Sequence, residues 1–381
     1  MFYNGGVDPI EKLKLLAGAT QHEPAGDEVA AGSSRIPAEL ANCISHIVSP
    51  RNPRMPVLKA MNTTACELDC SYCVFRSGMD TRRVSFTPDE MADGFFRLYQ
   101  AGLVEGLFLS SGVVGSGFRA QDQIIATAEI LRQELGYTGY LHLKVMPGAE
   151  YDQVVRTMEL ADRVSINLEA PTRVRLGRIA PTKELGGELL GRLGWIEQVR
   201  QNQGGRGPSS STQFVVGPAG ESDLELLHLT NHLYRNLGVK RAYFSAFFPV
   251  PGTPLENAAP TPAIRQHRLF QGSFLLRDYG FEVEELPFGP DGNLPRNQDP
   301  KLAWARANLS QEPVELNRAD RLTLLRVPGV GPAGAARVLR ERQRGTLRDL
   351  GELRKIGVLA DRAAPFIKLD GRRPPVQLPL W

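Results

Sequence analysis

Three cysteines, Cys66, Cys70 and Cys73, stand in the spacing C-x3-C-x2-C. This spacing holds three thiols on one short loop. Three thiolates can bind three irons of a cubane [4Fe–4S] cluster and leave the fourth iron open for chemistry, whereas a four-cysteine site is closed and mainly carries electrons. The loop is therefore a candidate cluster site, which the rest of the fold has to serve.

Two alternatives remain beside the cluster: a structural zinc site and unrelated buried thiols. Zinc needs a fourth ligand, usually from a second C-x2-C or H-x3-H pair, and neither the six histidines nor the one other cysteine, Cys43, forms such a pair. Cys43 itself is typical of a packed thiol, with a redox or substrate role as the alternative. Motifs further along the chain favour the cluster.

The cysteine run resembles the cluster loop of radical S-adenosylmethionine (SAM) enzymes, including the aromatic residue before the last cysteine, here Tyr72. The resemblance implies that SAM chelates the open iron through its amino and carboxylate groups. It also implies that one electron from the cluster cleaves SAM to a 5′-deoxyadenosyl radical. A low-potential donor such as flavodoxin or ferredoxin would supply that electron.

The chain of 381 residues is long enough for one large domain and one small one. It has no run of about 18 apolar residues, and its start lacks the basic stretch and apolar core of a signal peptide. Four cysteines, three of them in one motif, do not make a disulfide framework. We expect no membrane association and a cytoplasmic location, and the oligomeric state stays open.

Charge is unevenly distributed along the chain. The whole chain carries a formal net charge of +3, but Glu315–Trp381 contains 14 Lys and Arg against 7 Asp and Glu, which leaves a net −4 for the remainder. A basic segment on a slightly acidic protein indicates a polyanionic partner. A solvated charged face is the alternative that charge alone leaves open.

Composition and periodicity divide the chain into five parts. Residues 1–41 form a polar arm, with a short helix expected at Pro9–Ala17 and a loop or disorder at Ala25–Ser34. Residues 42–287 alternate between strand and helix patterns, and residues 288–313 are expected to be a linker. Short helices around glycine turns are expected at 314–370, followed by a tail at 371–381.

Six short runs in the central part are apolar on both faces, as buried parallel strands are. They are Val57–Met61, Gly106–Ser110, Tyr140–Val145, Arg163–Leu168, Thr212–Val216 and Arg241–Phe247. Helices are expected between them at Pro88–Ala101, Gln121–Leu135, Tyr151–Ala161, Leu185–Gln203 and Ser222–Leu237. Six right-handed units predict an open (β/α)6 partial TIM barrel, with chemistry at the carboxyl ends of the strands.

The segments at those strand ends resemble radical SAM motifs. Ser110-Ser111-Gly112 is similar to the segment whose backbone accepts hydrogen bonds from the SAM amino group, although the usual Gly-Gly-Glu form is absent. Asn167 and Glu169 share one face of their strand, and the resemblance implies that Glu169 binds the SAM ribose. A strand-end charge in a surface salt bridge is the alternative for Glu169.

The last two strands also carry such segments. Gly217 and Gly220 would permit a sharp turn past the adenine, and Glu221 would cap the next helix, as in the family's G-x-I-x-G-x-x-E segment. Pro249–Leu255 resembles the closing loop, so the resemblance covers about Val57–Leu255. On the third strand, Lys144 and His142 share a face. They could contact SAM or substrate, or form a satisfied buried pair.

The C-terminal run Leu324–Leu339 resembles a helix-hairpin-helix. Its first helix is expected at about Arg318–Arg326, capped by Asn317, and the turn Pro328-Gly329-Val330-Gly331 should expose backbone N–H groups. Such groups at a helix N-terminus bind phosphate without reading sequence.

Arg337, Arg340, Arg342 and Arg344 add positive charge after the turn. A fainter repeat at Leu353–Val358 would form the second half of the motif. A small helical packing or protein-interaction domain is the alternative.

Taken whole, the chain resembles the family of DNA modification/repair radical SAM proteins. This likeness extends through Glu11–Leu16, Gly106–Gly112, the run from Leu294 to Trp304, and the hairpin. It implies an enzyme that generates the radical and acts on nucleic acid, with DNA favoured. A radical SAM enzyme acting on RNA or on a small-molecule precursor, and a non-catalytic iron–sulfur protein that binds nucleic acid, are the alternatives.

Overall fold

A computed structural model describes residues 2–3, 8–16, 28–29, 37–48 and 52–375. The chain packs into two compact units. The first unit comprises residues 1–221 and 233–261, and the second comprises 222–232 and 262–381. The domain limits expected from the sequence stay predictions, although a helix, α9 (Pro300–Asn308), occupies part of the expected linker.

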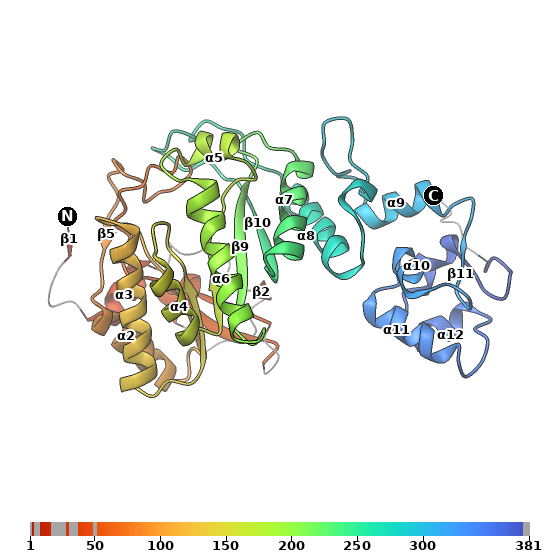
Figure 1. The fold of residues 1–381 in the computed structure, drawn as a ribbon, viewed down its shortest axis with the longest axis horizontal. Helices are drawn as coiled ribbons and strands as arrows, with labels where there is room; N and C mark the ends of the chain where they lie inside the picture. Colours follow the sequence, from red (N-terminus) through yellow and green to blue (C-terminus); the bar gives the residue numbers. More distant parts are fainter. Residues whose placement is uncertain (1, 4–7, 17–27, 30–36, 49–51, 376–381) are drawn as a thin grey trace. The chain divides into compact units, whose positions relative to one another are not determined.

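Six parallel strands in the first unit lie side by side in chain order, from β4 to β10 (Figure 1). They are β4 (Met55–Met61), β6 (Gly106–Ser110), β7 (Tyr140–Lys144), β8 (Arg163–Ser165), β9 (Ser209–Val216) and β10 (Arg241–Ala246). Because each crossover moves one strand further in the same direction, right-handed connections place every helix on the same face. This arrangement confirms the expected order of the (β/α)6 partial barrel.

The helices between these strands pack against one another in chain order, which leaves the other face of the sheet as the interior (Figure 1). They are α2 (Pro88–Gln100), α3 (Gly117–Glu129), α4 (Tyr151–Leu160) and α6 (Gly191–Asn202). Helix α7 (Asp223–Asn236) follows β9, and most of its residues belong to the second unit. Wider π-type turns continue α3 through Ile130–Glu134 and precede α6 at Leu185–Leu190. Helix α5 (Arg173–Ile179) was not expected, because it is too short for its period to show.

Alternate residues of the strands serve the two faces of the sheet. Leu58, Leu107 and Leu141 are paired neighbours and belong to the core beneath the helices. The adjacent row, Lys59, Phe108 and His142, lies on the opposite face and is also buried. The interior of the barrel therefore contains polar and charged side chains, as a site for a polar reactant requires.

The N-terminal region is more integrated than a polar arm. Helix α1 (Pro9–Leu16) forms where a helix was expected, and its Leu13 and Leu16 belong to the core of the first unit. Lys12 is buried and pairs with Glu90 at 2.7 Å. The expectation of loop or disorder at Ala25–Ser34 is wrong for Glu28–Val29, which form β2; the rest lies outside the described residues.

Strand β2 extends the sheet through β3 (Ile44–Ile47), which runs antiparallel to β4. Sequence analysis missed β3 because Ile44-Ser45-His46-Ile47 is too short to show a clear period. Among the described residues, the sheet therefore contains the six expected parallel strands and, beyond β4, the additional strands β3 and β2.

The second unit joins helices α8 (Ala263–Asp278) and α9 to a cluster of short helices. That cluster comprises α10 (Arg321–Arg326), α11 (Pro332–Glu341), α12 (Leu350–Lys355) and α13 (Ala360–Ala363). Ala305 of α9 and Leu309, which directly follows it, share one apolar core with Leu324 and Val330, so α9 and the cluster pack as one body. Strand β11 (Val314–Glu315) closes the cluster by pairing with β12 (Ile367–Lys368).

One expected cap in this unit is wrong. Helix α10 is capped by Asp320, whose carboxylate accepts from the Thr323 N–H at 2.7 Å. The Asn317 side chain instead bridges to Leu347, donating to its carbonyl and accepting from its N–H. Both Asn and Asp are good caps, so local chemistry could not choose between them.

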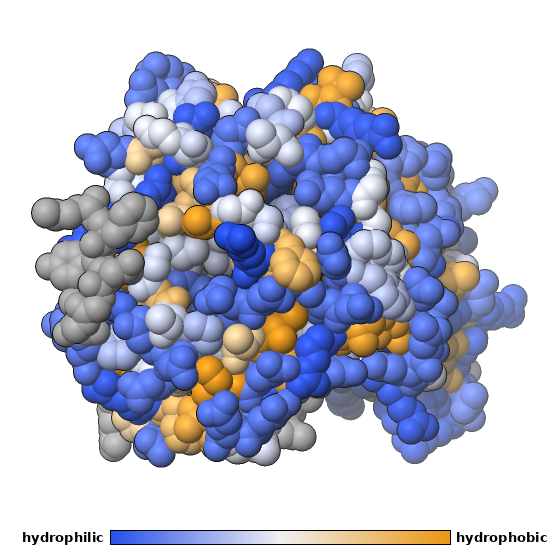
Figure 2. Space-filling model, turned by 60° about the vertical axis from the view of Figure 1, so that its left-hand side comes forward, coloured by the Kyte–Doolittle hydropathy of each residue, from blue (hydrophilic) through white to orange (hydrophobic). Residues whose placement is uncertain are grey.

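Hydrophilic residues predominate on the face drawn in Figure 2, and the apolar residues there form small separate patches. Among the described residues, no helix combines the length and apolar character needed to cross a membrane.

Candidate functional site at the strand ends

The cysteine loop follows β4 and is held in place by backbone contacts with the end of β6. The Gly112 N–H donates to the Thr63 carbonyl at 2.7 Å, and the Glu67 N–H donates to the Val113 carbonyl at 2.8 Å. A Cβ at Gly112 would lie 2.0 Å from the Ala65 carbonyl oxygen. Glycine is therefore required at position 112 so that the two loops can approach each other closely.

Arg83 braces the same loop from within, and sequence analysis did not single it out. Its guanidinium donates to the carbonyl groups of Thr64, Phe75, Arg76 and Met79, at 2.8 to 3.2 Å. Four carbonyl groups on one rigid donor fork fix the path of the backbone around the cysteines. The loop thus has a defined shape from the protein's own contacts.

The three thiols lie near one another. Cys70 is buried, and Cys66 and Cys73 are partly buried. Burial, together with the neighbouring thiols Cys70 and Cys66, raises the pKa of Cys73 to about 12. Burial also raises the pKa of Cys70, against the opposing charge of Lys183. Such thiols become thiolates only beside positive charge, which metal ions supply.

Backbone N–H groups point at two of the sulfurs. The Val113 N–H donates to Cys66 Sγ at 3.5 Å, and the Phe75 N–H donates to Cys73 Sγ at 3.3 Å. Hydrogen bonds to cysteine sulfur are one way in which a protein adjusts an iron–sulfur cluster. Within the described ranges, no three His, Cys, Asp or Glu side chains form a group suited to one metal ion. A cubane would need the three thiols as ligands of three different irons, so it does not require them to meet at one ion.

Glu169 lies beside this loop, in a buried ion pair. Its backbone has a φ of 62°, in the left-handed region, and its side chain is 3% exposed. Lys183 Nζ donates to Glu169 Oε1 at 2.9 Å. Burial works to raise the pKa of Glu169, but the charges of Lys183 and Lys144 outweigh it and hold that pKa below its usual range. The carboxylate is thus charged and buried, unlike the surface salt bridge that was the alternative.

The second oxygen of this carboxylate is not used by Lys183, although the Tyr72 hydroxyl lies close enough to help lower the pKa of Glu169. Glu169 Oε2 is buried and has no hydrogen-bond partner among the described residues. The Tyr72 hydroxyl lies near the carboxylate, and burial together with this negative charge raises the pKa of Tyr72 well above its usual value. Leaving a buried carboxylate oxygen without a donor is costly. A ligand with hydroxyl groups would remove that cost.

Lys183 reaches the site from a loop that packs on the cysteine run. The Ser71 N–H donates to the Ile179 carbonyl at 2.7 Å, and the Thr182 hydroxyl donates to Asp69 Oδ1 at 2.8 Å. The pKa of Lys183 is raised despite burial, because Cys70 and Glu169 lie close to its ammonium group. Sequence analysis missed Lys183, since it lies in a loop where neither strand period nor motif marks it.

The buried polar residues at the end of β6 and β4 include one that the sequence did not mark. Ser110 and Ser111 are buried, and the Ser110 carbonyl accepts from the Asn62 N–H at 2.9 Å. Both polar atoms of the Asn62 side chain are buried without a hydrogen-bond partner among the described residues. Asn62 directly precedes the cysteine loop, and this position was its only signal.

Lys144 and His142, which were expected to share a face, have different surroundings. His142 Nε2 lies 2.8 Å from the Ser165 hydroxyl, and its ring packs edge-on against Phe108. Lys144 is close enough to Glu169 to lower its pKa. The structure therefore brings Lys144 to the strand-end site, whereas His142 is a satisfied buried residue.

Asn167 belongs to a row of side chains across the interior. Its amide nitrogen lies 3.5 Å from Gln213 Oε1, and the Gln213 amide donates to the Ser245 hydroxyl at 2.8 Å. These contacts link the segment that follows β8 to β9 and β10. The Asn167 side chain is therefore oriented by its contact with Gln213, and its contact with a cofactor stays a prediction.

The turn after β9 needs glycine at two positions, as the sequence indicated. Gly217 and Gly220 have φ values of 109° and 69°. Glu221 does not cap α7, because its carboxylate accepts from the Gly217 N–H and so closes this turn. The Ser222 hydroxyl takes the capping role by accepting from the Glu225 N–H at 3.2 Å. The expected capping role of Glu221 is therefore wrong, although its place in the turn is confirmed.

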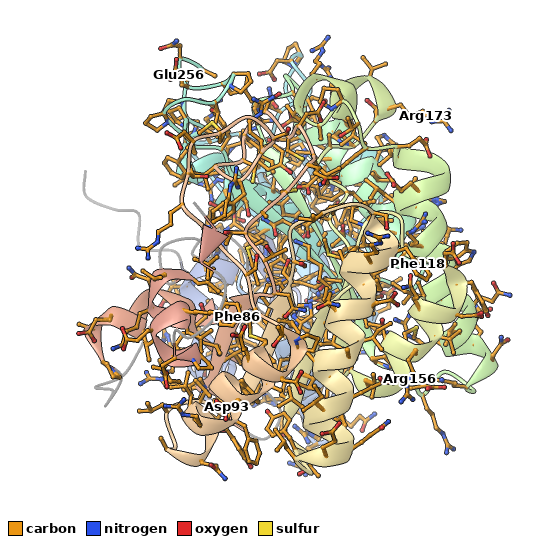
Figure 3. The ribbon with its side chains drawn as sticks, turned by 90° about the vertical axis from the view of Figure 1, so that its left-hand side faces the viewer. Phe86, Asp93, Phe118, Arg156, Arg173 and Glu256 are labelled. Atoms are coloured by element: carbon orange, nitrogen blue, oxygen red, sulfur yellow. The ribbon has the colours of Figure 1, made fainter. Side chains whose placement is uncertain are left out.

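The segments that follow the strands gather at one end of the first unit. Arg173, at the start of α5 after β8, and Glu256, in the loop after β10, both lie at the upper end of Figure 3. Asp93 and Arg156, within α2 and α4, lie toward the opposite end. This grouping fits a reaction site at the carboxyl ends of the strands.

The residues expected to bind nucleic acid lie in the second unit and differ in exposure. Pro328 and Val330 are buried, and the Val330 N–H donates to the Val327 carbonyl at 3.1 Å. Gly329 has a φ of 84°, and its carbonyl accepts from the Leu359 N–H. These three residues therefore build the turn, and its Val330 N–H is not exposed.

The outer residues of this group are more accessible. Gly331 caps the start of α11, Arg337 is partly exposed and Arg340 is exposed. A second pair of short helices, α12 and α13, meets at Gly357, whose φ is 71°. The faint repeat thus lies in two short helices joined by a turn, while its assignment to the helix-hairpin-helix motif stays a prediction.

Comparisons with known proteins give structural likeness alone. No family model matches the chain, and no curated protein sequence matches it. HydG, a maturase of the [FeFe]-hydrogenase, has a TM-score of 0.47 and 11% identity, covering 58% of this chain and 49% of HydG. Methylornithine synthase (PylB) has a TM-score of 0.46 and 16% identity, covering 58% and 61% respectively.

A third solved structure is the radical S-adenosylmethionine methyltransferase TsrM from Kitasatospora setae with tryptophan substrate. It has a TM-score of 0.39 and 13% identity, and the match covers 56% of this chain and 39% of TsrM. The chain therefore spans about half of HydG, three fifths of PylB and two fifths of TsrM.

Proposed function

We propose that this chain is a radical SAM enzyme that acts on nucleic acid, with DNA as the favoured substrate. The observation that carries the proposal is the grouping of three thiols with a buried Glu169 that has one unbonded oxygen. The thiols would hold a [4Fe–4S] cluster, which when bound supplies the electron that cleaves SAM to a 5′-deoxyadenosyl radical. A low-potential protein donor would deliver that electron.

The residues around the thiols have separable roles in this proposal. Glu169 would accept hydrogen bonds from the ribose hydroxyls of SAM through its free Oε2. Lys183 would hold that carboxylate in place through Oε1. Lys144 would add positive charge near the SAM carboxylate. Each of these groups is buried, so the site excludes the water that would quench a radical.

Support for nucleic acid comes from the second unit. Its segment Glu315–Trp381 carries a net +7, which favours a polyanion. The start of α11 adds N–H groups at a glycine-containing turn. The base to be modified would have to leave its stack, or be presented in a single strand, to reach the strand ends.

Anaerobic product analysis tests the proposal. The protein, reconstituted with iron and sulfide, is incubated with SAM and dithionite, and 5′-deoxyadenosine is measured. Damaged DNA, matched RNA and nucleosides are added in parallel. We expect 5′-deoxyadenosine in all reactions and a rise with DNA. A rise with RNA or nucleosides alone would replace the substrate, and no 5′-deoxyadenosine under any condition would overturn the enzyme.

A further inference from the structure

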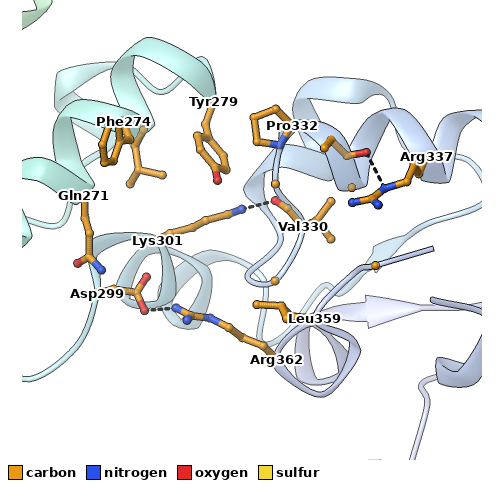
Figure 4. Close-up of a pocket in the computed structure, with 16 residues that line it drawn as sticks. Gln271, Phe274, Tyr279, Asp299, Lys301, Val330, Pro332, Arg337, Leu359 and Arg362 are labelled. Carbon is orange, nitrogen blue, oxygen red and sulfur yellow. Dashed lines mark hydrogen bonds and ion pairs between the residues drawn. The ribbon is translucent and has the colours of Figure 1, made fainter. Parts of the chain in front are cut away.

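A pocket of about 450 Å³ lies entirely within the second unit, beside the start of α11 (Figure 4). Pockets for small ligands have volumes of about 300–1,000 Å³. Its lining combines three cations, Lys301, Arg337 and Arg362, with the aromatic rings of Phe274 and Tyr279. One carboxylate, Asp299, is also present, so the lining carries an excess of positive charge.

The cations are fixed by contacts with different elements. Lys301 of α9 donates to the Val330 carbonyl at 2.6 Å and lies 4.5 Å from the centre of the Tyr279 ring. Arg362 of α13 pairs with Asp299. Arg337 rests on the second glycine turn, where a Cβ at Gly357 would lie 2.9 Å from its guanidinium. Contacts between side chains and backbone of different elements therefore fix the positions of the three cations around the pocket.

The electrostatics of the pocket favour an anion. Burial and the charge of Arg362 lower the pKa of Lys301 to about 7, with Arg326 contributing and Asp299 opposing. Like charges held together in a partly buried place repel one another, and an anion would relieve that repulsion. The first N–H groups of α11, at Ala333 and Gly334, have no acceptor within their helix and lie in the same lining.

The opposite wall suits a flat, partly apolar group. Phe274 of α8 and Tyr279, which directly follows α8, present their rings (Figure 4). Gln271 adds an amide whose oxygen accepts from Arg268 at 2.8 Å and whose nitrogen can donate. Aromatic rings stack on nucleobases, at about 1–3 kcal/mol per base. A cationic floor with an aromatic wall and one amide is the chemistry that recognises a nucleotide.

We propose that this pocket binds a nucleoside phosphate, with the phosphate at Lys301, Arg362 and the start of α11 and the base against Phe274 and Tyr279. The ligand is either the phosphorylated end of a strand or a free nucleotide. The proposal deepens the nucleic-acid part of the proposed function. It predicts recognition of a terminal phosphate, which sequence-independent binding to backbone phosphates would not produce.

The test uses the full chain and fluorescence anisotropy. Two labelled single-stranded oligonucleotides of one sequence are compared, one with a 5′-phosphate and one with a 5′-hydroxyl. The terminal phosphate should increase affinity about ten- to hundredfold, the ratio expected for one or two charge-assisted hydrogen bonds. Adenosine 5′-monophosphate is the competitor. Competition identifies a free-nucleotide pocket, and preference without competition identifies a strand-end pocket.

Variants locate the effect. Lys301→Met should remove the preference, Lys301→Arg should largely restore it, and Arg348→Ala, an exposed cation outside the lining, should keep it. Equal binding of both oligonucleotides with no effect of the monophosphate overturns the pocket, as does a preference that survives in folded Lys301→Met. If the 5′-hydroxyl strand binds as tightly as the 5′-phosphate strand, the nucleic-acid proposal stands while the pocket proposal fails. If neither strand binds, the nucleic-acid proposal fails, and the monophosphate titration alone decides the pocket.

Discussion

The strand-end site and the pocket beside α11 both contain several cations, buried in the first and partly or largely exposed in the second, and they balance this charge differently. In the first unit, Lys183 and Lys144 face Glu169, which stays ionised between them. In the second unit, Lys301 lies near Arg362 and Arg326, which pair with Asp299 and Glu285, and burial together with the charge of Arg362 lowers its pKa to about 7. A balanced site positions its ligand through hydrogen bonds, whereas an unbalanced one attracts an anion through charge.

The largest expected effect concerns the cysteine loop. Cys70→Ala should remove iron from the reconstituted protein and abolish 5′-deoxyadenosine formation, because two thiols cannot hold a cubane site that needs three. Iron analysis and product chromatography measure both.

Cys43→Ala is the matched control for this substitution. Its thiol is buried, donates to the Leu40 carbonyl at 3.2 Å, and has a pKa raised by burial to about 11. The Cys43→Ala protein should keep its iron. Full activity in Cys70→Ala would contradict the assignment of the cysteine loop as the cluster site.

The next effect tests the balance of charge in the first unit. Lys183→Met should lower the free energy of unfolding by about 3–5 kcal/mol, because it leaves the buried Glu169 carboxylate without its partner. Chemical unfolding of the anaerobic, iron-free protein measures this loss. The double variant Lys183→Met/Glu169→Gln should recover much of it.

Arg173→Ala provides the surface reference. It removes an exposed pair with Glu184 and should cost less than about 1 kcal/mol. If Lys183→Met and Arg173→Ala were equally mild, the Glu169 pair would not be a buried one in solution.

A smaller effect is expected for the oxygen that has no partner. Glu169→Gln should weaken SAM binding by about ten- to a hundredfold while the iron content stays the same, since one charge-assisted contact is lost. Equilibrium binding to the cluster-loaded protein measures the change. Glu256→Gln, an exposed carboxyl change at the same end of the unit, should leave SAM affinity unaltered. Unchanged affinity in Glu169→Gln would assign the carboxylate to structure alone.

The smallest effect is a pH dependence in the second unit. The groups around Lys301 are Tyr279 after α8, Asp299 at the start of α9, Arg362 of α13 and Arg326 of α10. The Lys301 pKa of about 7 lies below the usual value for lysine, and a bound phosphate would raise it, so binding takes up a proton. Affinity for the 5′-phosphate should therefore fall by up to about tenfold between pH 7.5 and 8.5.

Two features make this measurement specific. A phosphate monoester is already doubly charged across that range, because its second pKa is about 6. Lys301→Arg should abolish the dependence, since arginine stays protonated. A flat profile in the unaltered protein would contradict the unbalanced charge of the pocket.

Local sequence patterns predicted much of both regions. The apolar runs predicted six parallel strands in order, and Thr87-Pro88 predicted the start of α2, where Thr87 and Glu90 form a capping box. Glycine marked turns at Gly217, Gly329 and Gly357, all with positive φ. Each of these features depends on a few consecutive residues, so the local sequence is enough to predict it.

Contacts between distant residues were out of reach of those patterns. Lys183 meets Glu169 because the loop after α5 packs on the cysteine run, and nothing near Lys183 marks it. Strand β3 and the capping residue Asp320 were missed because short segments have several acceptable local solutions.

By itself, the sequence determined the cysteine spacing, the strand order and the glycine turns, since these follow from residue type and period. The tertiary structure alone decided which carboxylate is ionised between lysines and that Lys301 of α9 donates to Val330 in the turn before α11. The physical reason is that pKa values and ligand pockets depend on burial and on distances between side chains. Those distances exist only once remote segments have packed together.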